Sequence, residues 1–164
     1  HNYFLDWLNS KFIKTIVEKV SEARKYKLDH LYQTLDTPKS SHIAQDPHFD
    51  RMPTLKFMLY LNDMDKSNGA FVLSPGSHHW VKENFKKRGA FNDDRFFKKT
   101  RTIPKPIIDN LINLEGKAGT LIIFLTDCIH MQGKVKQNES RIFRAGYRKQ
   151  SRNKLVKYLK VFKR

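Results

Sequence analysis

The sequence predicts a mainly β protein, a β-sandwich or barrel supported by helices that lie mostly at the N-terminus. Two observations lead to this fold class. Several short apolar or alternating segments are separated by turns rich in glycine and proline, and a stretch with helical periodicity precedes them. The 164 residues fit one domain spanning 1–164, and 39% hydrophobic residues are enough for a packed core.

The N-terminal segment, residues 3–25, has the pattern of an amphipathic helix. Its apolar residues recur at three- and four-residue steps, and charged residues occupy the other side. We expect a scaffold helix lying on a sheet, followed by a shorter helical piece around 28–35. Residues 37–40, Thr-Pro-Lys-Ser, then break the chain into a loop.

Strand patterns follow. Residues 54–61 alternate, so leucine and phenylalanine side chains share one face. The other face carries Lys56, Met58 and Tyr60. The polar segment 62–69 ends in Asn-Gly, a turn signal, and 70–73 returns as a strand before Pro-Gly. Residues 120–125 have the composition of a buried strand, and 141–147 form another.

Two basic segments are harder to place. Residues 81–106 are dense in lysine and arginine with interspersed phenylalanines, and they predict a partly helical insertion over the mouth of the core. These aromatic residues favour a loop pinned to its own domain over stacking on nucleic-acid bases. The tail, residues 153–164, is interpreted as a packed helix or strand, with a basic helix on a membrane surface as the alternative.

The charge and the apolar content of the chain limit the classes of partner that it can bind. Thirty-two Lys and Arg against 16 Asp and Glu give a net charge of +16, which favours anionic partners such as nucleic acid, charged metabolites or acidic membranes. The lysines are scattered and no recognition motif stands out, so nucleic acid is disfavoured and the charge can also be without function. The longest apolar run, 121–125, is far too short for a membrane span.

The cysteine content indicates the compartment. Cys128 is the single cysteine, which fits a reducing, cytoplasmic environment. It lies two residues before His130, but a small buried side chain is favoured over a catalytic thiol. No secretory signal pattern is present, and the chain begins at His1, so we expect that the natural N-terminus and any targeting segment are missing.

The main chemical signal is His48-Phe49-Asp50 followed by the distant His130. On an extended strand, residues two apart point to the same face, so His48 and Asp50 can reach one ion. Two histidines and one carboxylate form the facial triad of non-haem Fe(II), which leaves the opposite face of the metal open for cosubstrate and O2. His78 and His79 are rival ligands by type, but we interpret them as part of a turn.

An arginine follows the triad at position 141. The guanidinium fork of Arg141 suits the distal carboxylate of 2-oxoglutarate, because it donates two parallel hydrogen bonds. Arg141 alternates with Phe143 and Ala145 and therefore shares a face with apolar residues. Arg144 and Arg148 have the opposite parity and are poorer candidates.

These features resemble the phytanoyl-CoA dioxygenase family over residues 44–148. The matching segments are Pro47-His48-Phe49-Asp50, residues 55–63, Asn68-Gly69-Ala70-Phe71, Ser74-Pro75-Gly76-Ser77-His78, Gly119-Thr120-Leu121, His130, Gly133 and Arg141. The Asn-Gly followed by Pro-Gly-Ser-His is the most specific part, since metal triads of other origin lack it.

The resemblance implies a double-stranded β-helix, the jelly-roll or cupin-like core. It also implies Fe(II) held by His48, Asp50 and His130, with 2-oxoglutarate bound to the metal and to Arg141, and O2 as the oxidant. The implied reaction converts 2-oxoglutarate to succinate and CO2 and hydroxylates an unactivated C–H bond. A carboxylate at Asp50, instead of alanine or glycine, favours hydroxylation over halogenation.

The sequence departs from the family in places that concern the cosubstrate. Gln132 stands where many relatives have a small hydroxyl residue, and Lys56, Tyr60 or Gln45 are candidates to assist Arg141. We expect a small or medium, anionic metabolite as substrate. The alternatives are a non-catalytic cupin-like module that binds metal or ligand, and the same chemistry on a protein or nucleic acid.

Overall fold

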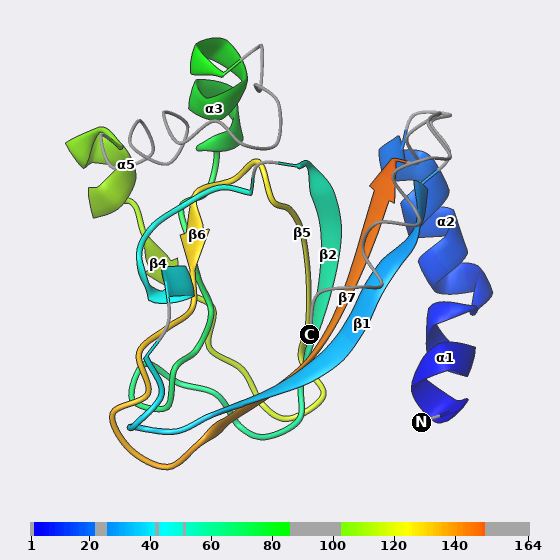
Figure 1. Cartoon of the computed structure of the whole chain (residues 1–164), viewed down its shortest axis with the longest axis horizontal. Coiled ribbons are helices and arrows are strands. Elements are labelled where there is room, and N and C mark those ends of the chain that lie inside the picture. Colours follow the sequence, from blue (N-terminus) through cyan, green and yellow to red (C-terminus); the bar gives the residue numbers. More distant parts are fainter. Residues whose placement is uncertain (1, 22–25, 42, 51, 86–102, 150–164) are drawn as a thin grey trace, which may run out of the picture.

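Two β-sheets face each other in the computed structural model, which describes residues 2–21, 26–41, 43–50, 52–85 and 103–149 (Figure 1). The larger sheet has the strand order β1-β7-β2-β5 and the smaller one the order β4-β3-β6. The strands are β1 (Tyr26–Asp36), β2 (Thr54–Tyr60), β3 (Val72–Leu73), β4 (Ile112–Asn113), β5 (Leu121–Leu125), β6 (His130–Met131) and β7 (Ser140–Lys149). All pairings are antiparallel, and the mainly β prediction is confirmed.

Two helices, α1 (Asn2–Leu8) and α2 (Lys11–Ser21), cover the outer face of the larger sheet (Figure 1). The face that they cover consists of Leu55, Phe57, Phe143, Ala145 and Tyr147, which pack against Leu8, Ile13 and Val17. Phe4 stacks on Phe143 with ring centroids 3.9 Å apart. Burial of each large apolar side chain here contributes roughly 2 kcal/mol, so the amphipathic helices are held mainly by this contact.

The single helix expected over residues 3–25 is divided in two. The break falls at Asn9 and Ser10, whose side chains compete with the helical backbone. Ser10 then accepts a hydrogen bond from the N–H of Ile13 at 3.4 Å, which caps the start of α2.

The prediction of a helical piece around 28–35 is wrong, because these residues belong to β1. This strand pairs with β7 from Tyr26 to Asp36, with a register irregularity between Leu28 and His30. As the edge strand it is exposed at many positions, and the irregularity shifts the phase of its alternation. The period of two is therefore lost in the sequence, although long-range pairing makes the segment a strand.

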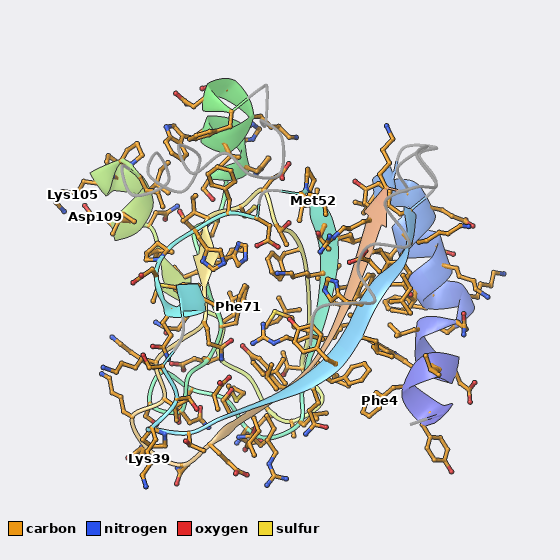
Figure 2. The ribbon with its side chains drawn as sticks, in the orientation of Figure 1. Phe4, Lys39, Met52, Phe71, Lys105 and Asp109 are labelled. Carbon is orange, nitrogen blue, oxygen red and sulfur yellow. The ribbon has the colours of Figure 1, made fainter. Side chains whose placement is uncertain are left out.

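The inner face of the larger sheet, which points toward the smaller one, is also apolar. Met58 and Tyr60 of β2, Ile122 and Phe124 of β5 and Ile142 of β7 form a buried cluster with Phe71, which precedes β3. Phe71 points into the space between the sheets (Figure 2). The strands expected at 54–61, 70–73, 120–125 and 141–147 correspond to β2, β3, β5 and β7 and are confirmed.

Short helices flank the basic segment. The helix α3 (His78–Asn84) overlaps the start of this segment, 81–106, and α5 (Lys105–Asp109) overlaps its end, so the expected helical parts lie at its ends. Most of the insertion predicted at 81–106, and the tail 153–164, fall outside the described residues. In the part of the chain that the structure describes, no helix is long and apolar enough to cross a membrane.

Candidate metal centre

The chain segment that leads into β2 crosses from the smaller sheet to the larger one. His48 forms an antiparallel bridge with His130 of β6, with N–H···O distances of 3.0 and 2.8 Å. The N–H of Asp50 donates to the carbonyl oxygen of Thr126 at 3.0 Å, and the N–H of Thr54 donates to the Thr126 hydroxyl at 2.9 Å. This crossing places His48 and Asp50 between the sheets, beside the strand that carries His130.

The three side chains meet as the spacing predicts. One oxygen of Asp50, Oδ1, lies 3.7 Å from Nε2 of His130 and 3.9 Å from Nε2 of His48. The potential ligand atoms all lie within 4.8 Å of one another. Among the described residues this is the only such group, and His78 and His79 are not part of it. A single ion can therefore contact all three side chains.

Backbone carbonyls fix both imidazoles in the form that binds metal. Nδ1 of His48 lies 2.7 Å from the oxygen of Asp46, and Nδ1 of His130 lies 2.8 Å from the oxygen of Cys128. A carbonyl only accepts, so each Nδ1 carries the proton and each Nε2 presents its lone pair. This is the arrangement that a divalent metal requires.

The buried Nε2 atom of His130 indicates whether these residues fit a metal. Its side chain is only 3% exposed, and its Nε2 has no hydrogen-bond partner among the described residues. Burial, followed by the neighbouring His48, lowers the pKa of His130 to about 3, so the ring is neutral at pH 7. A buried, neutral nitrogen without a partner costs free energy unless a ligand completes it. The donor set of two imidazoles and a carboxylate fits Fe(II).

Asp50 has two differently placed oxygens. While Oδ1 faces the imidazoles, Oδ2 lies 2.9 Å from Nζ of Lys56. Burial alone would raise the pKa of Asp50, but Lys56 and the two histidines outweigh it and lower the pKa below 3.8. The carboxylate is therefore charged at neutral pH. Lys56, expected to assist with the cosubstrate, contacts Asp50 of the triad.

Arg144 is the arginine inside the site. It alternates with Ile142 on β7 and pairs with Met58 of β2, so it lies on the inner face. Its guanidinium donates to the hydroxyl of Thr34 at 3.2 Å and to Oε1 of Gln132, and approaches the sulfur of Met58 at 3.8 Å. Burial lowers its pKa. The hydrogen-bond acceptors Thr34 and Gln132 are neutral, and the charge of the buried Asp36 also stabilises the cation.

Arg141 does not reach the triad. Its side chain is 49% exposed and pairs with Glu139 at 2.6 Å. The prediction assumed that the face shared with Phe143 and Ala145 lines the site, but those residues belong to the outer face under the helices. Both faces of β7 are apolar, so parity alone could not tell which one faces the metal. Arg144, the poorer candidate by parity, lies on the inner face with Met58 and Ile142.

The other predicted cosubstrate residues have different outcomes. Gln132 is buried next to the site and accepts from Arg144. Tyr60 donates its hydroxyl to the oxygen of Leu114 at 2.7 Å and accepts from the N–H of Phe71 at 3.0 Å, which is a structural role. Gln45 donates to a nearby backbone oxygen at 3.2 Å, outside the triad.

The Pro-Gly-Ser-His turn supports His130. The hydroxyl of Ser77 accepts from the N–H of Ile129 at 2.7 Å and donates to the oxygen of Ser74 at 2.6 Å. Sequence reasoning identified the turn but missed this contact beside His130. Cys128 is half-buried, and burial raises its pKa, which does not suit a reactive thiol.

Comparison with known proteins decides the family. The family model for phytanoyl-CoA dioxygenase matches residues 3–143. The chain belongs to the phytanoyl-CoA dioxygenase family. Membership confirms the resemblance, and with it the prediction of Fe(II), 2-oxoglutarate and O2 as cofactors. A search of curated proteins found no match.

Solved structures of low sequence identity share the fold of this family member. HygX from Streptomyces hygroscopicus, solved with nickel and 2-oxoglutarate bound, is 15% identical over 88% of this chain and 64% of its own, with a TM-score of 0.55. The epimerase SnoN from nogalamycin biosynthesis is 15% identical over 100% of this chain and 65% of its own, with a TM-score of 0.61. AviO1 from Streptomyces viridochromogenes Tue57 is 17% identical over 87% of this chain and 59% of its own, with a TM-score of 0.58.

These matches confirm the jelly-roll core of the family. The chain spans about two thirds or less of the length of these three structures.

Proposed function

We propose that the protein is an Fe(II)- and 2-oxoglutarate-dependent hydroxylase. His48, Asp50 and His130 would hold the iron, and Arg144 would bind the distal carboxylate of 2-oxoglutarate. The products would be succinate, CO2 and a hydroxylated small or medium metabolite. The observation that carries the proposal is a buried guanidinium on the inner face of the larger sheet, with the triad lying between the same two sheets.

The spacing along β2 supports this pairing. Lys56, which contacts Asp50, and Met58 are neighbours on the inner face, about 7 Å apart along the strand. Arg144 lies opposite Met58 in the register of β2 and β7. Lys56, at the triad, and Arg144 therefore occupy adjacent inner-face positions of β2 and β7, and 2-oxoglutarate carries a carboxylate at each end.

The triad and the aromatic rings beside it would have different roles in the reaction. When bound, iron and 2-oxoglutarate supply the O2 chemistry that couples decarboxylation to oxidation of a C–H bond. The Nε2 atoms of the two imidazoles and Asp50 Oδ1 would provide the ligand atoms. The rings of Phe71 and Phe124, centred 5.7 and 5.1 Å from that of His130, exclude water from its buried side.

The cosubstrate would change the contacts of Arg144. Its Nη2 donates to Gln132 in the structure, so a carboxylate would share or replace that acceptor. A charged acceptor makes shorter and stronger hydrogen bonds than an amide does. Replacement is therefore favourable, and Gln132 can turn its amide N–H toward the incoming carboxylate.

The reaction type and the substrate are the finer parts of the proposal. Asp50 as third ligand supports hydroxylation over halogenation. HygX has been solved with hygromycin B bound, and SnoN is an epimerase, so relatives of this fold handle small molecules with different outcomes. The net charge of +16 supports an anionic substrate. That the chain forms a single domain, and that it works in the reducing cytoplasm, also stay predictions.

Succinate formation tests the function. Purified protein with Fe(II), 2-oxoglutarate and O2 should form succinate slowly even without substrate, and His48→Ala should abolish it. The control His79→Ala changes a histidine of α3 outside the triad and should leave the rate unchanged. Metal binding without succinate would indicate a binding module. Succinate with an unoxygenated product would indicate a reaction other than hydroxylation.

A further inference from the structure

A lysine ammonium lies beside the carboxylate of the metal centre. Lys56 is on the inner face of β2, and its side chain is 17% exposed. Its Nζ lies 2.9 Å from Oδ2 of Asp50. A cation next to a cation site opposes metal binding by charge, so its presence needs a compensating role.

The contact separates the two oxygens of Asp50. Oδ1 lies 3.7 and 3.9 Å from the Nε2 atoms of the two histidines, whereas Oδ2 is at Lys56. A carboxylate free to rotate can offer both oxygens to an ion. Here a short, charge-assisted contact holds one of them.

We propose that Lys56 is a positioning residue that makes Asp50 a ligand through one oxygen only. An octahedral ion with three single-atom protein ligands keeps three open positions. Binding through both carboxylate oxygens would fill one of them. Lys56 thereby preserves the position that the second reactant needs. The use of these positions by 2-oxoglutarate and O2 rests on the proposed function, whereas the contact itself does not.

The rigidity of β2 makes Lys56 suited to this task. Its neighbours on β2, Leu55 and Phe57, are 1% exposed, and the residue pairs with Phe124 of β5 and Gly146 of β7. The backbone of Lys56 is thus fixed from both sides of the strand. Because the backbone and the mostly buried side chain of Lys56 are already restrained, its contact to Asp50 has a lower entropy cost than the contact of an exposed lysine.

The number of metal-bound waters tests the proposal without turnover. Mn(II) is loaded in place of iron, and the relaxation of water protons reports the exchangeable positions. Lys56→Met should reduce the relaxivity of bound Mn(II) to about two thirds of that of the parent protein, as three open positions become two. Lys56→Arg, which keeps a charged donor, should restore it. An unchanged relaxivity in Lys56→Met overturns the proposal.

Two comparisons make the result specific. Lys117 pairs with Asp63 at 2.8 Å on the exposed surface, and Lys117→Met should leave the relaxivity unchanged. If Lys56→Met does not fold, Lys56→Gln, which lacks the charge and the reach, replaces it in the same comparison. Addition of 2-oxoglutarate to the parent Mn(II) protein tests the proposed function separately, because it should displace two waters. No displacement would refute cosubstrate binding and leave the Lys56 result valid.

Discussion

Arg144→Met removes the proposed anchor of the cosubstrate while retaining side-chain bulk. A carboxylate on the guanidinium fork accepts two charge-assisted hydrogen bonds, each contributing about 1.5 to 3 kcal/mol. The neutral contacts to Thr34 and Gln132 offset part of this in the unliganded protein. A net loss of about 3 kcal/mol corresponds to about 100-fold weaker binding of 2-oxoglutarate.

Calorimetric titration of 2-oxoglutarate into the Mn(II)-loaded protein measures this loss, and Mn(II) affinity should be retained. Arg144→Lys, which keeps the charge without the fork, should lie between parent and Arg144→Met. Arg141→Met is the matched control, since an exposed ion pair contributes only about 0 to 1 kcal/mol and does not face the site. A larger loss for Arg141→Met than for Arg144→Met would refute the assignment of the inner face.

Three other predictions concern stability. Tyr60→Phe should lower the free energy of unfolding in urea by about 2 kcal/mol, because two backbone partners lose their hydrogen bond to the hydroxyl. The affinity for 2-oxoglutarate should stay unchanged, and a tenfold weaker affinity would place Tyr60 in the cosubstrate site. For the metal-free protein, the free energy of unfolding in urea should decrease as the pH falls from 6.5 toward about 3, because the unfolded chain protonates His130 while burial keeps the folded ring neutral. His130→Gln should flatten this dependence of the free energy on pH. Equal slopes in the parent protein and His130→Gln would contradict the prediction. Gly133→Ala should destabilise the fold by about 1 to 3 kcal/mol, since an added Cβ collides with the carbonyl oxygen of Ala70, and an unchanged thermal midpoint would contradict that.

The sequence was most informative where local geometry and chemistry coincide. The alternation of β2 follows from strand geometry and is seen in the structure. His48 and Asp50 also meet as their two-residue spacing predicts, although their segment forms only an isolated bridge at His48. The partnership with His130 needs a pairing between segments some 80 residues apart. Ligand chemistry and the family resemblance suggested that partnership, and the bridge between His48 and His130 now accounts for it.

The two arginines of β7, Arg141 and Arg144, show what parity in the sequence leaves open. A sheet covered by helices on one side and by a second sheet on the other is apolar on both faces, so Phe143 and Ile142 look alike in sequence. A buried arginine that hydrogen-bonds to Thr34 and Gln132 is visible only in three dimensions. The same holds for β1, whose strand identity comes from pairing with β7 and not from its own pattern.

Anaerobic titration with Fe(II) and 2-oxoglutarate tests most directly whether the triad and Arg144 form one site. The account predicts a weak visible charge-transfer band that requires both components, saturates at one equivalent of each, and is absent in His48→Ala. Arg144→Met should give the band only at much higher 2-oxoglutarate concentration. A parent protein that binds Fe(II) but shows no band, or a band that survives in His48→Ala, would contradict the account.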